Sequence, residues 1–391
     1  MERSFFAKNP SVLWFLLGLS VFTIAVTILS EASGTAIIST SFLKTLGKTL
    51  CLCLVAIAMD VVWGYCGILS LGHFAFFGIG GYAIGMWLMY ARTEEIVVTS
   101  LENATLPPTP DEITKAIGSQ IFGVVGSSDF PLIWAFSHSL TLQLLAVVMV
   151  PGALALVFGW LAFRSRVTGV YLSILTQAMT LALSLYFFQN DTGLRGNNGL
   201  SGLQNIPGLE AISQATVSLW FFWASAVALG AGYVLFAWIT AGKLGSVIRA
   251  IRDDEARVRF LGYHVEGYKL FIFTITAIVA GIAGALYYPQ AGIINPAEIA
   301  PIASIYLAVW VAIGGRGRLY GAVIGAAVVS LMSSWFTGGG APDINLGFYV
   351  INWTDWWLVL LGLTFVAVTL FFPKGIGGLF DLLHNRKGDG A

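Results

Sequence analysis

Apolar runs of roughly 20 residues recur along the chain, and each is long enough for a helix to cross about 30 Å of hydrocarbon. They predict ten transmembrane or re-entrant helices, at about residues 12–30, 46–63, 67–91, 132–162, 168–188, 217–240, 269–288, 302–314, 320–336 and 356–372. The predicted fold is therefore an all-α polytopic membrane protein, with residues 1–391 forming a single transmembrane domain. Segment 302–314 is too short for a perpendicular span, so we expect it to pair with segment 320–336 as a discontinuous or re-entrant element.

Glycine is concentrated in two parts of this pattern, around residues 64–85 and 314–325. Small residues let membrane helices approach closely, and broken helices are typical of solute sites near the middle of a bilayer. Plain tight packing explains any single glycine equally well. The glycines predicted to be structural are Gly64, Gly67, Gly72, Gly78, Gly196, Gly199, Gly314 and Gly315.

Composition supports a membrane location for the whole chain. Hydrophobic residues make up 57% and charged residues 10%, where a soluble domain carries about 25% charge. The net charge of zero speaks against a nucleic-acid partner. The three cysteines lie in or beside apolar segments without histidines at ligand spacing, so neither a metal site nor a cofactor is predicted.

The distribution of lysine and arginine predicts the orientation. When both termini are placed on one side, most of the 20 basic residues fall in the tails and loops of that side. The positive-inside rule then makes both termini cytoplasmic. It also makes 92–131 an external loop, expected to be loosely folded, and 241–268 a cytoplasmic loop.

The cytoplasmic loop carries seven charges within the eleven positions from Arg249 to Arg259. Read as one helix, its apolar residues Val247, Ile251, Val258 and Leu261 form a stripe, and Gly262 follows as a helix end. This pattern favours a short surface helix that docks another protein. A solvated loop helix and a lipid-surface anchor remain as alternatives.

Ionisable residues are scarce within the spans, which disfavours proton- or sodium-coupled transport and intramembrane hydrolysis. Uncharged polar residues near an external Gly/Asn segment, 190–200, instead suggest a passage for a small neutral solute, although such a segment is often only a loop. The candidate pathway residues are Ser70, His73, Gln177, Thr180, Asn197 and Asn198.

Several stretches resemble the branched-chain amino acid type ABC permeases, the LivH/LivM family. These stretches are 64–82, 163–171, 249–262, 312–321 and 372–375. The resemblance implies a non-enzymatic permease subunit in a bacterial inner membrane. It also implies as partners a second homologous permease subunit in a heterodimer, two ABC ATPases that hydrolyse ATP, and a periplasmic or lipid-anchored solute-binding protein.

The segments 173–177, 190–199 and 288–296 look most like urea-transport permeases of the LivM-like type, while Ala303 and Tyr306 depart from that pattern. The charged loop is similar to the coupling helix of importer permeases, with Arg257 in place of an alanine and the glycine displaced by one position. The resemblance therefore assigns coupling to the ATPase to Arg249, Arg252, Asp253, Asp254, Glu255, Ala256, Arg257, Arg259 and Gly262.

The sequence thus predicts an ATP-driven importer permease for urea. A permease for branched-chain or other neutral amino acids or short amides is the nearest alternative. A passive urea channel and a structural scaffold are the alternatives from other classes.

Overall fold

The computed structural model describes residues 5, 9–31, 37–102, 110–122, 131–134, 136–189, 192–338, 340, 342, 344–345, 350–371 and 375–378. Its helices are α2 (Pro10–Glu31), α3 (Thr40–Asp60), α4 (His73–Glu102), α5 (Pro110–Phe122), α6 (Leu140–Arg164), α7 (Val170–Phe188), α8 (Gln214–Ala241), α9 (Lys243–Asp253), α10 (Glu255–Phe260), α11 (Val265–Ala291), α12 (Pro301–Gly314), α13 (Leu319–Thr337) and α14 (Trp353–Phe371). Two short antiparallel pairs join β1 (Leu200–Ser201) to β2 (Ile293–Ile294) and β3 (Ile344–Asn345) to β4 (Val350–Ile351).

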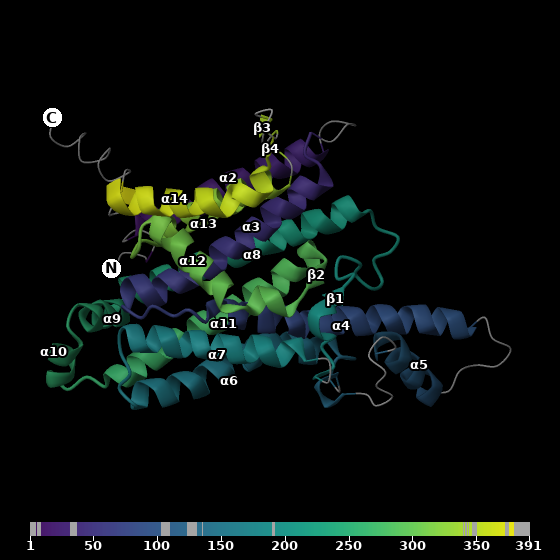
Figure 1. Cartoon of the computed structure of the whole chain (residues 1–391), viewed down its shortest axis with the longest axis horizontal. Coiled ribbons are helices and arrows are strands. Elements are labelled where there is room, and N and C mark those ends of the chain that lie inside the picture. The colour runs from purple at the N-terminus through teal and green to yellow at the C-terminus, as the bar shows by residue number, and fades with distance from the viewer. Residues whose placement is uncertain are drawn as a thin grey trace.

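The predicted all-α membrane fold is confirmed. Among the described residues, eight helices are long and apolar enough to cross a membrane, and α12 and α14 supply two shorter apolar helices. Figure 1 shows α9 and α10 at one end of the elongated bundle and α5 at the other. The charged loop helices and α5 therefore lie at opposite ends of the membrane helices (Figure 1).

Several predicted boundaries were wrong, and the largest error at the start of a span is at residue 132, since α6 begins at Leu140. Two other differences concern the ends of α4. The span expected to begin at residue 67 begins at His73, because residues 66–72 are not helical. The segment 92–131, expected to be loosely folded, contains the last turns of α4 and all of α5, while residues 103–109 and 123–130 lie outside the described part. Local apolar content could not reveal either feature, because helices can continue beyond the hydrocarbon and break within it.

Helix α3 forms the centre of the bundle, where it contacts α8, α11 and α13. Every residue in the C-terminal half of α3, from Cys51 to Asp60, is buried. A helix that is apolar on all sides is stable only when other helices surround it or when it faces lipid. The outer helix α2 shows the second case, since it exposes Trp14, Val21 and Ile28.

Helices α4 and α11 touch through their backbones. A Cβ atom built on Gly80 would lie 2.0 Å from the carbonyl oxygen of Gly281, and one built on Gly284 would lie 1.8 Å from that of Phe77. Only glycine permits this approach, so small residues fix the separation of the two helices. The approach holds the start of α4, where the candidate site lies, against the middle of α11.

Candidate solute pathway and coupling region

Two helices begin side by side inside the bundle. The chain leaves α3 through a π-helical turn (Val61–Tyr65), runs without helix to residue 72 and then begins α4. The amide of Phe74 in the first turn of α4 donates to Ser304 Oγ in the first turn of α12, at 3.1 Å. The expectation of discontinuous helices is therefore met by α4 as well as by the short α12.

The non-helical segment before α4 is satisfied by hydroxyl groups of α7. Ser173 Oγ donates to Leu69 O at 2.7 Å, and Leu71 N donates to Thr176 Oγ1 at 3.0 Å. Thr180 Oγ1 lies 3.3 Å from Leu71 O. The three hydroxyl residues share one face of α7 because of their helical spacing. Since irregular backbone within a membrane needs such partners, this polar face holds the break in place.

His73 links the start of α4 to α11. Its Nδ1 lies 3.1 Å from Ser70 Oγ and its Nε2 lies 3.3 Å from Thr276 Oγ1. Because the Thr276 hydroxyl donates to Ile272 O, its oxygen is left to accept from Nε2–H, which makes Nδ1 the acceptor for Ser70. The imidazole is fully buried between the edges of aromatic rings. Ser70 and His73 therefore both form hydrogen bonds within the chain.

The structure separates the predicted pathway residues into three places. Ser70, His73 and Thr180 are buried around the helix break. Gln177 lies half-buried on α7 beside the hydroxyl face, and its amide has no hydrogen-bond partner among the described residues. Asn197 and Asn198 are exposed on a 3₁₀ turn next to β1, whereas Asn190 and Asp191 of the same motif lie outside the described residues. Gln177 and the two asparagines are therefore the pathway candidates that are at least partly exposed.

Four of the eight predicted structural glycines, Gly67, Gly196, Gly199 and Gly315, have positive φ angles. Three others pack tightly: a Cβ atom on Gly64, Gly78 or Gly314 would lie 2.2 Å, 2.4 Å or 2.0 Å from its nearest neighbour. Gly72 is less tightly packed, with its nearest neighbour at 3.1 Å. The clearest functional consequence is at Gly199, where a Cβ atom would lie 2.0 Å from Ile294 O and would separate β1 from β2.

Sequence reasoning missed a pair of opposite charges near the β1–β2 end of the bundle. Glu298 follows β2 on a 3₁₀ turn (Pro296–Ile299) and interacts electrostatically with Lys48 of α3. Burial raises the pKa of the Glu298 carboxyl above its ordinary value, while Tyr288 and Lys48 favour the charged form and oppose that shift. The turn that carries Glu298 packs against α4 and α7. The two charges are far apart in the chain, so their proximity left no sequence signal.

The charged loop forms two helices rather than the single one expected. Helix α9 ends at Asp253, Asp254 adopts an extended conformation, and α10 begins at Glu255. Asp254 Oδ1 accepts a hydrogen bond from Arg257 N at 3.0 Å, so it caps the second helix. Asp254 was the available sequence signal for this break. It interrupts the apolar stripe, and its side chain can cap a new helix by accepting from the amide three residues later.

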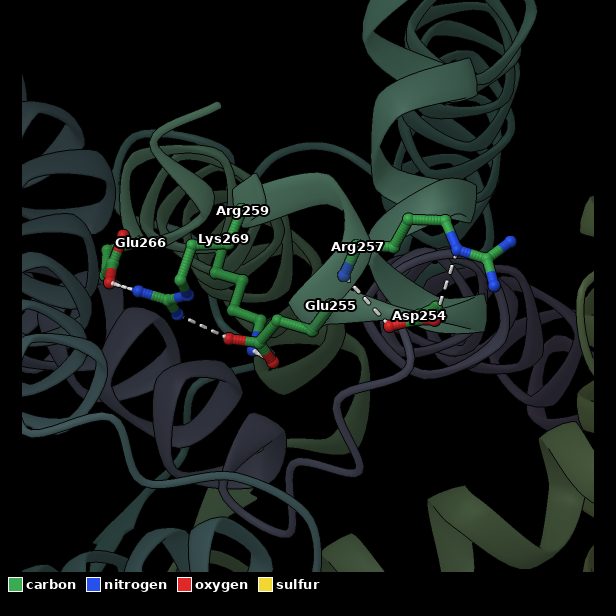
Figure 2. A network of polar contacts seen from close by, with 6 residues as sticks. All are labelled: Asp254, Glu255, Arg257, Arg259, Glu266 and Lys269. Carbon is green, nitrogen blue, oxygen red and sulfur yellow. Dashed lines mark hydrogen bonds and ion pairs between the residues drawn. The ribbon is translucent and has the colours of Figure 1, made fainter. Parts of the chain in front are cut away.

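An ion-pair network ties α10 to the start of α11 (Figure 2). Arg259 donates to Glu255 at 2.8 Å and also to Glu266, and Lys269 donates to the other carboxylate oxygen of Glu255. The hydrogen bonds that Arg259 donates to Glu266 and Glu255 raise the pKa of its guanidinium, which keeps it charged. Glu255 and Arg259 therefore turn toward the bundle, and Glu266 and Lys269 of α11 were missed as their partners.

The apolar stripe was only partly right. Ile251 and Val258 are buried as expected, but Ile248 is buried in preference to Val247, and Leu261 is 72% exposed. The helix break at Asp254 changes the direction of the second segment, which takes Leu261 out of the stripe.

The remaining coupling candidates fall into two groups. Arg249 Nη1 donates to Thr240 O and Arg252 Nη1 donates to Gly64 O, both at 2.8 Å, so these side chains hold the ends of α8 and α3. The outward surface of the loop consists of Asp253, Asp254, Ala256, Arg257, Phe260, Leu261 and Gly262. Gly262 has φ +88°, the conformation expected of a helix-ending glycine.

The sequence profile of the family described as branched-chain amino acid transport system/permease component matches residues 41–369. The chain belongs to this family. As a family member it is a multi-pass permease with α2 lying before the matched region and α14 closing it. This agrees with the predicted location in the bacterial inner membrane.

Individual relatives of this permease are distant. It is 25% identical to the high-affinity branched-chain amino acid transport system permease protein LivM of Escherichia coli K12, over 65% of this chain and 61% of that protein. It is 23% identical to LivM of Salmonella typhimurium, over 83% of this chain and 67% of that protein. A probable LivH of Methanocaldococcus jannaschii is 28% identical over 35% of this chain and 41% of its own length. No solved structure matches.

Proposed function

We propose that this chain is the membrane subunit of an ATP-driven importer, in which separate ATPase subunits act on the bundle through α9 and α10. The supporting observation is the division of charged residues along this loop. Glu255 and Arg259 are ion-paired to α11, whereas the side chain of Arg257 is 80% exposed. One face is therefore anchored to the bundle and the other is free for a partner. Complementary charges on such a surface select the partner and its orientation.

The proposed assembly contains a second homologous permease subunit, two ABC ATPases and an external solute-binding protein. The names of the relatives, which describe permease proteins of transport systems, support this composition. Affinity purification of the intact chain with a C-terminal tag should recover the ATPases and the second permease. Recovery of this chain alone under mild detergent conditions would contradict the proposal.

We propose urea as the solute. The urea-type segment 173–177 places Gln177 on α7. The second such segment, 288–296, runs from the end of α11 through β2. The hydroxyls and the imidazole around the helix break are uncharged and bonded within the chain, while the Gln177 amide has no hydrogen-bond partner in the part of the chain that the structure describes. Such groups suit an uncharged solute with several hydrogen-bond sites.

A branched-chain or other neutral amino acid is the second candidate, favoured by the names of the relatives and by the Lys48–Glu298 pair. A zwitterion carries a carboxylate and an ammonium group, so one cation and one anion at the same site suit it. Urea needs neither charge. The two candidates therefore make opposite predictions for variants that lack this pair.

The discriminating experiment is uptake of labelled urea and labelled leucine by the complete importer reconstituted in proteoliposomes. The double variant Lys48→Met/Glu298→Gln removes both charges together, which avoids leaving one of them buried alone. If urea is the solute, we expect its uptake by this double variant to stay within about twofold of the wild type. Gln177→Ala should instead lower urea uptake by about tenfold, because it removes one hydrogen bond to the solute.

Leucine uptake that disappears in the double variant, together with no urea uptake by the wild type, would establish the amino acid candidate. Urea uptake that persists without the ATPase subunits would instead show a passive channel. Matched expression and elution profiles serve as the control for folding in each variant.

A further inference from the structure

A cavity of about 320 Å³ opens between the end of α6 and the start of α11, and the proposed transport function does not use it. Trp160, Phe163, Arg164 and Arg166 line one side, and Glu266, Gly267 and Leu270 line the other. The cavity adjoins α10, because its lining residue Glu266 accepts a hydrogen bond from Arg259 of that helix, and the positive-inside bias predicts the cytoplasmic membrane surface there. Its depth thus corresponds to the level of lipid headgroups.

Two arginines and a tryptophan give the cavity the chemistry of a headgroup site. The guanidinium of Arg164 lies 5.2 Å from the centre of the Trp160 ring, and both side chains are exposed. Tryptophan prefers the membrane–water interface, and a stacked arginine keeps its outward N–H groups available for an anion. This half of the cavity therefore presents a fixed cation at the edge of the apolar surface.

Arg166 adds a second cation in an unusual backbone conformation. Its φ angle of +56° is a left-handed value that residues with a side chain rarely adopt. Residues held in this way are often found at ligand sites. Arg166 also interacts electrostatically with Glu266, so one carboxylate opposes the two guanidinium groups and the cavity carries an excess of positive charge.

We propose that this cavity binds the headgroup phosphate of an anionic phospholipid, with Arg164 and Arg166 as the phosphate ligands. Basic pockets between membrane helices on the cytoplasmic side suit such headgroups, because the guanidinium fork matches phosphate oxygens while the acyl chains stay on the apolar surface of α6. Leu156 and Leu161 of α6 are exposed beside the site and supply that surface.

The site also connects lipid to the ion-pair network, since Glu266 both lines the cavity and accepts from Arg259. A bound phosphate would compete with Glu266 for Arg166. Occupancy by lipid would then leave Glu266 more fully engaged with Arg259 and so stabilise the link between α10 and α11.

Native mass spectrometry of the purified full-length protein, titrated with phosphatidylglycerol, phosphatidylcholine or glycerol phosphate, tests the proposal. Phosphatidylglycerol should bind most tightly. Arg164→Gln/Arg166→Gln should weaken its binding about 25-fold, which is about fivefold for each arginine and corresponds to about 1 kcal/mol per cation. Glu266→Gln should strengthen binding. Lys243→Gln, which removes an exposed cation from the same end of the bundle, should change it by less than about twofold.

Equal binding of the two lipids, or unchanged phosphatidylglycerol binding in the double variant, would overturn the proposal. Equally tight binding of glycerol phosphate would show a site for soluble phosphate instead. Loss of ATPase subunits from the double variant with lipid binding intact would assign the arginines to the protein partner. The opposite signs expected for Glu266→Gln and the arginine variants separate a site effect from general misfolding.

Discussion

Replacement of Glu255 by glutamine should weaken the connection between α10 and α11 while leaving the shape of the side chain almost unchanged. Glu255 accepts from Arg259 at 2.8 Å and also from Lys269, whose side chain is only 7% exposed. The variant leaves that ammonium group without its charged partner. Breaking a fully buried ion pair costs about 3–5 kcal/mol, and an exposed pair is worth about 0–1 kcal/mol. Because Glu255 is 26% exposed, we expect a loss between these limits, about 2 kcal/mol.

The free energy of unfolding in detergent measures this loss, and the ratio of solute taken up to ATP hydrolysed measures coupling in the reconstituted importer. Both should fall in Glu255→Gln. Arg257→Gln is the matched control for stability, since its side chain is 80% exposed and its loss should cost less than about 0.5 kcal/mol.

A double-mutant cycle with Glu255→Gln and Lys269→Met should return an interaction energy of about 1–3 kcal/mol, because the two residues share one ion pair. An interaction energy near zero in this cycle, together with an unchanged ratio of solute taken up to ATP hydrolysed, would refute the argument that this network transmits force.

Three further substitutions test the packing. Gly80→Ala should prevent assembly of the fold, seen as aggregation during purification, because the new Cβ atom would lie 2.0 Å from Gly281 O. Thr176→Val should destabilise the protein by about 1–3 kcal/mol in detergent unfolding, because it leaves the amide of Leu71 unpaired, whereas Thr176→Ser should be close to wild type. Gly262→Ala should cost about 1–2 kcal/mol from its φ of +88° alone, as the position has open space around it. A neutral result for Gly80→Ala or Thr176→Val would contradict the contact on which the prediction depends, and a neutral result for Gly262→Ala would contradict the positive φ of that residue.

The sequence by itself determined the class of the protein and the position of most of its long apolar helices. Runs of apolar residues are a local property, and their length is set by the thickness of the bilayer, so α2, α8 and α13 were all predictable. The charged loop was predictable for the same reason, since seven charges cannot lie within hydrocarbon. Gly262 was expected to end its helix because glycine is the residue best suited to positive φ.

Only the tertiary structure decided which polar groups meet. Thr176 and Leu71 are far apart in the chain, and their hydrogen bond exists because α7 packs against the break before α4. The same applies to the hydrogen bond between Ser304 and Phe74, and the electrostatic interaction of Lys48 with Glu298 likewise depends on how the helices pack. A single sequence records how each segment partitions between water and lipid. It does not record which faces of those segments touch, because that depends on packing among helices that are almost equally apolar.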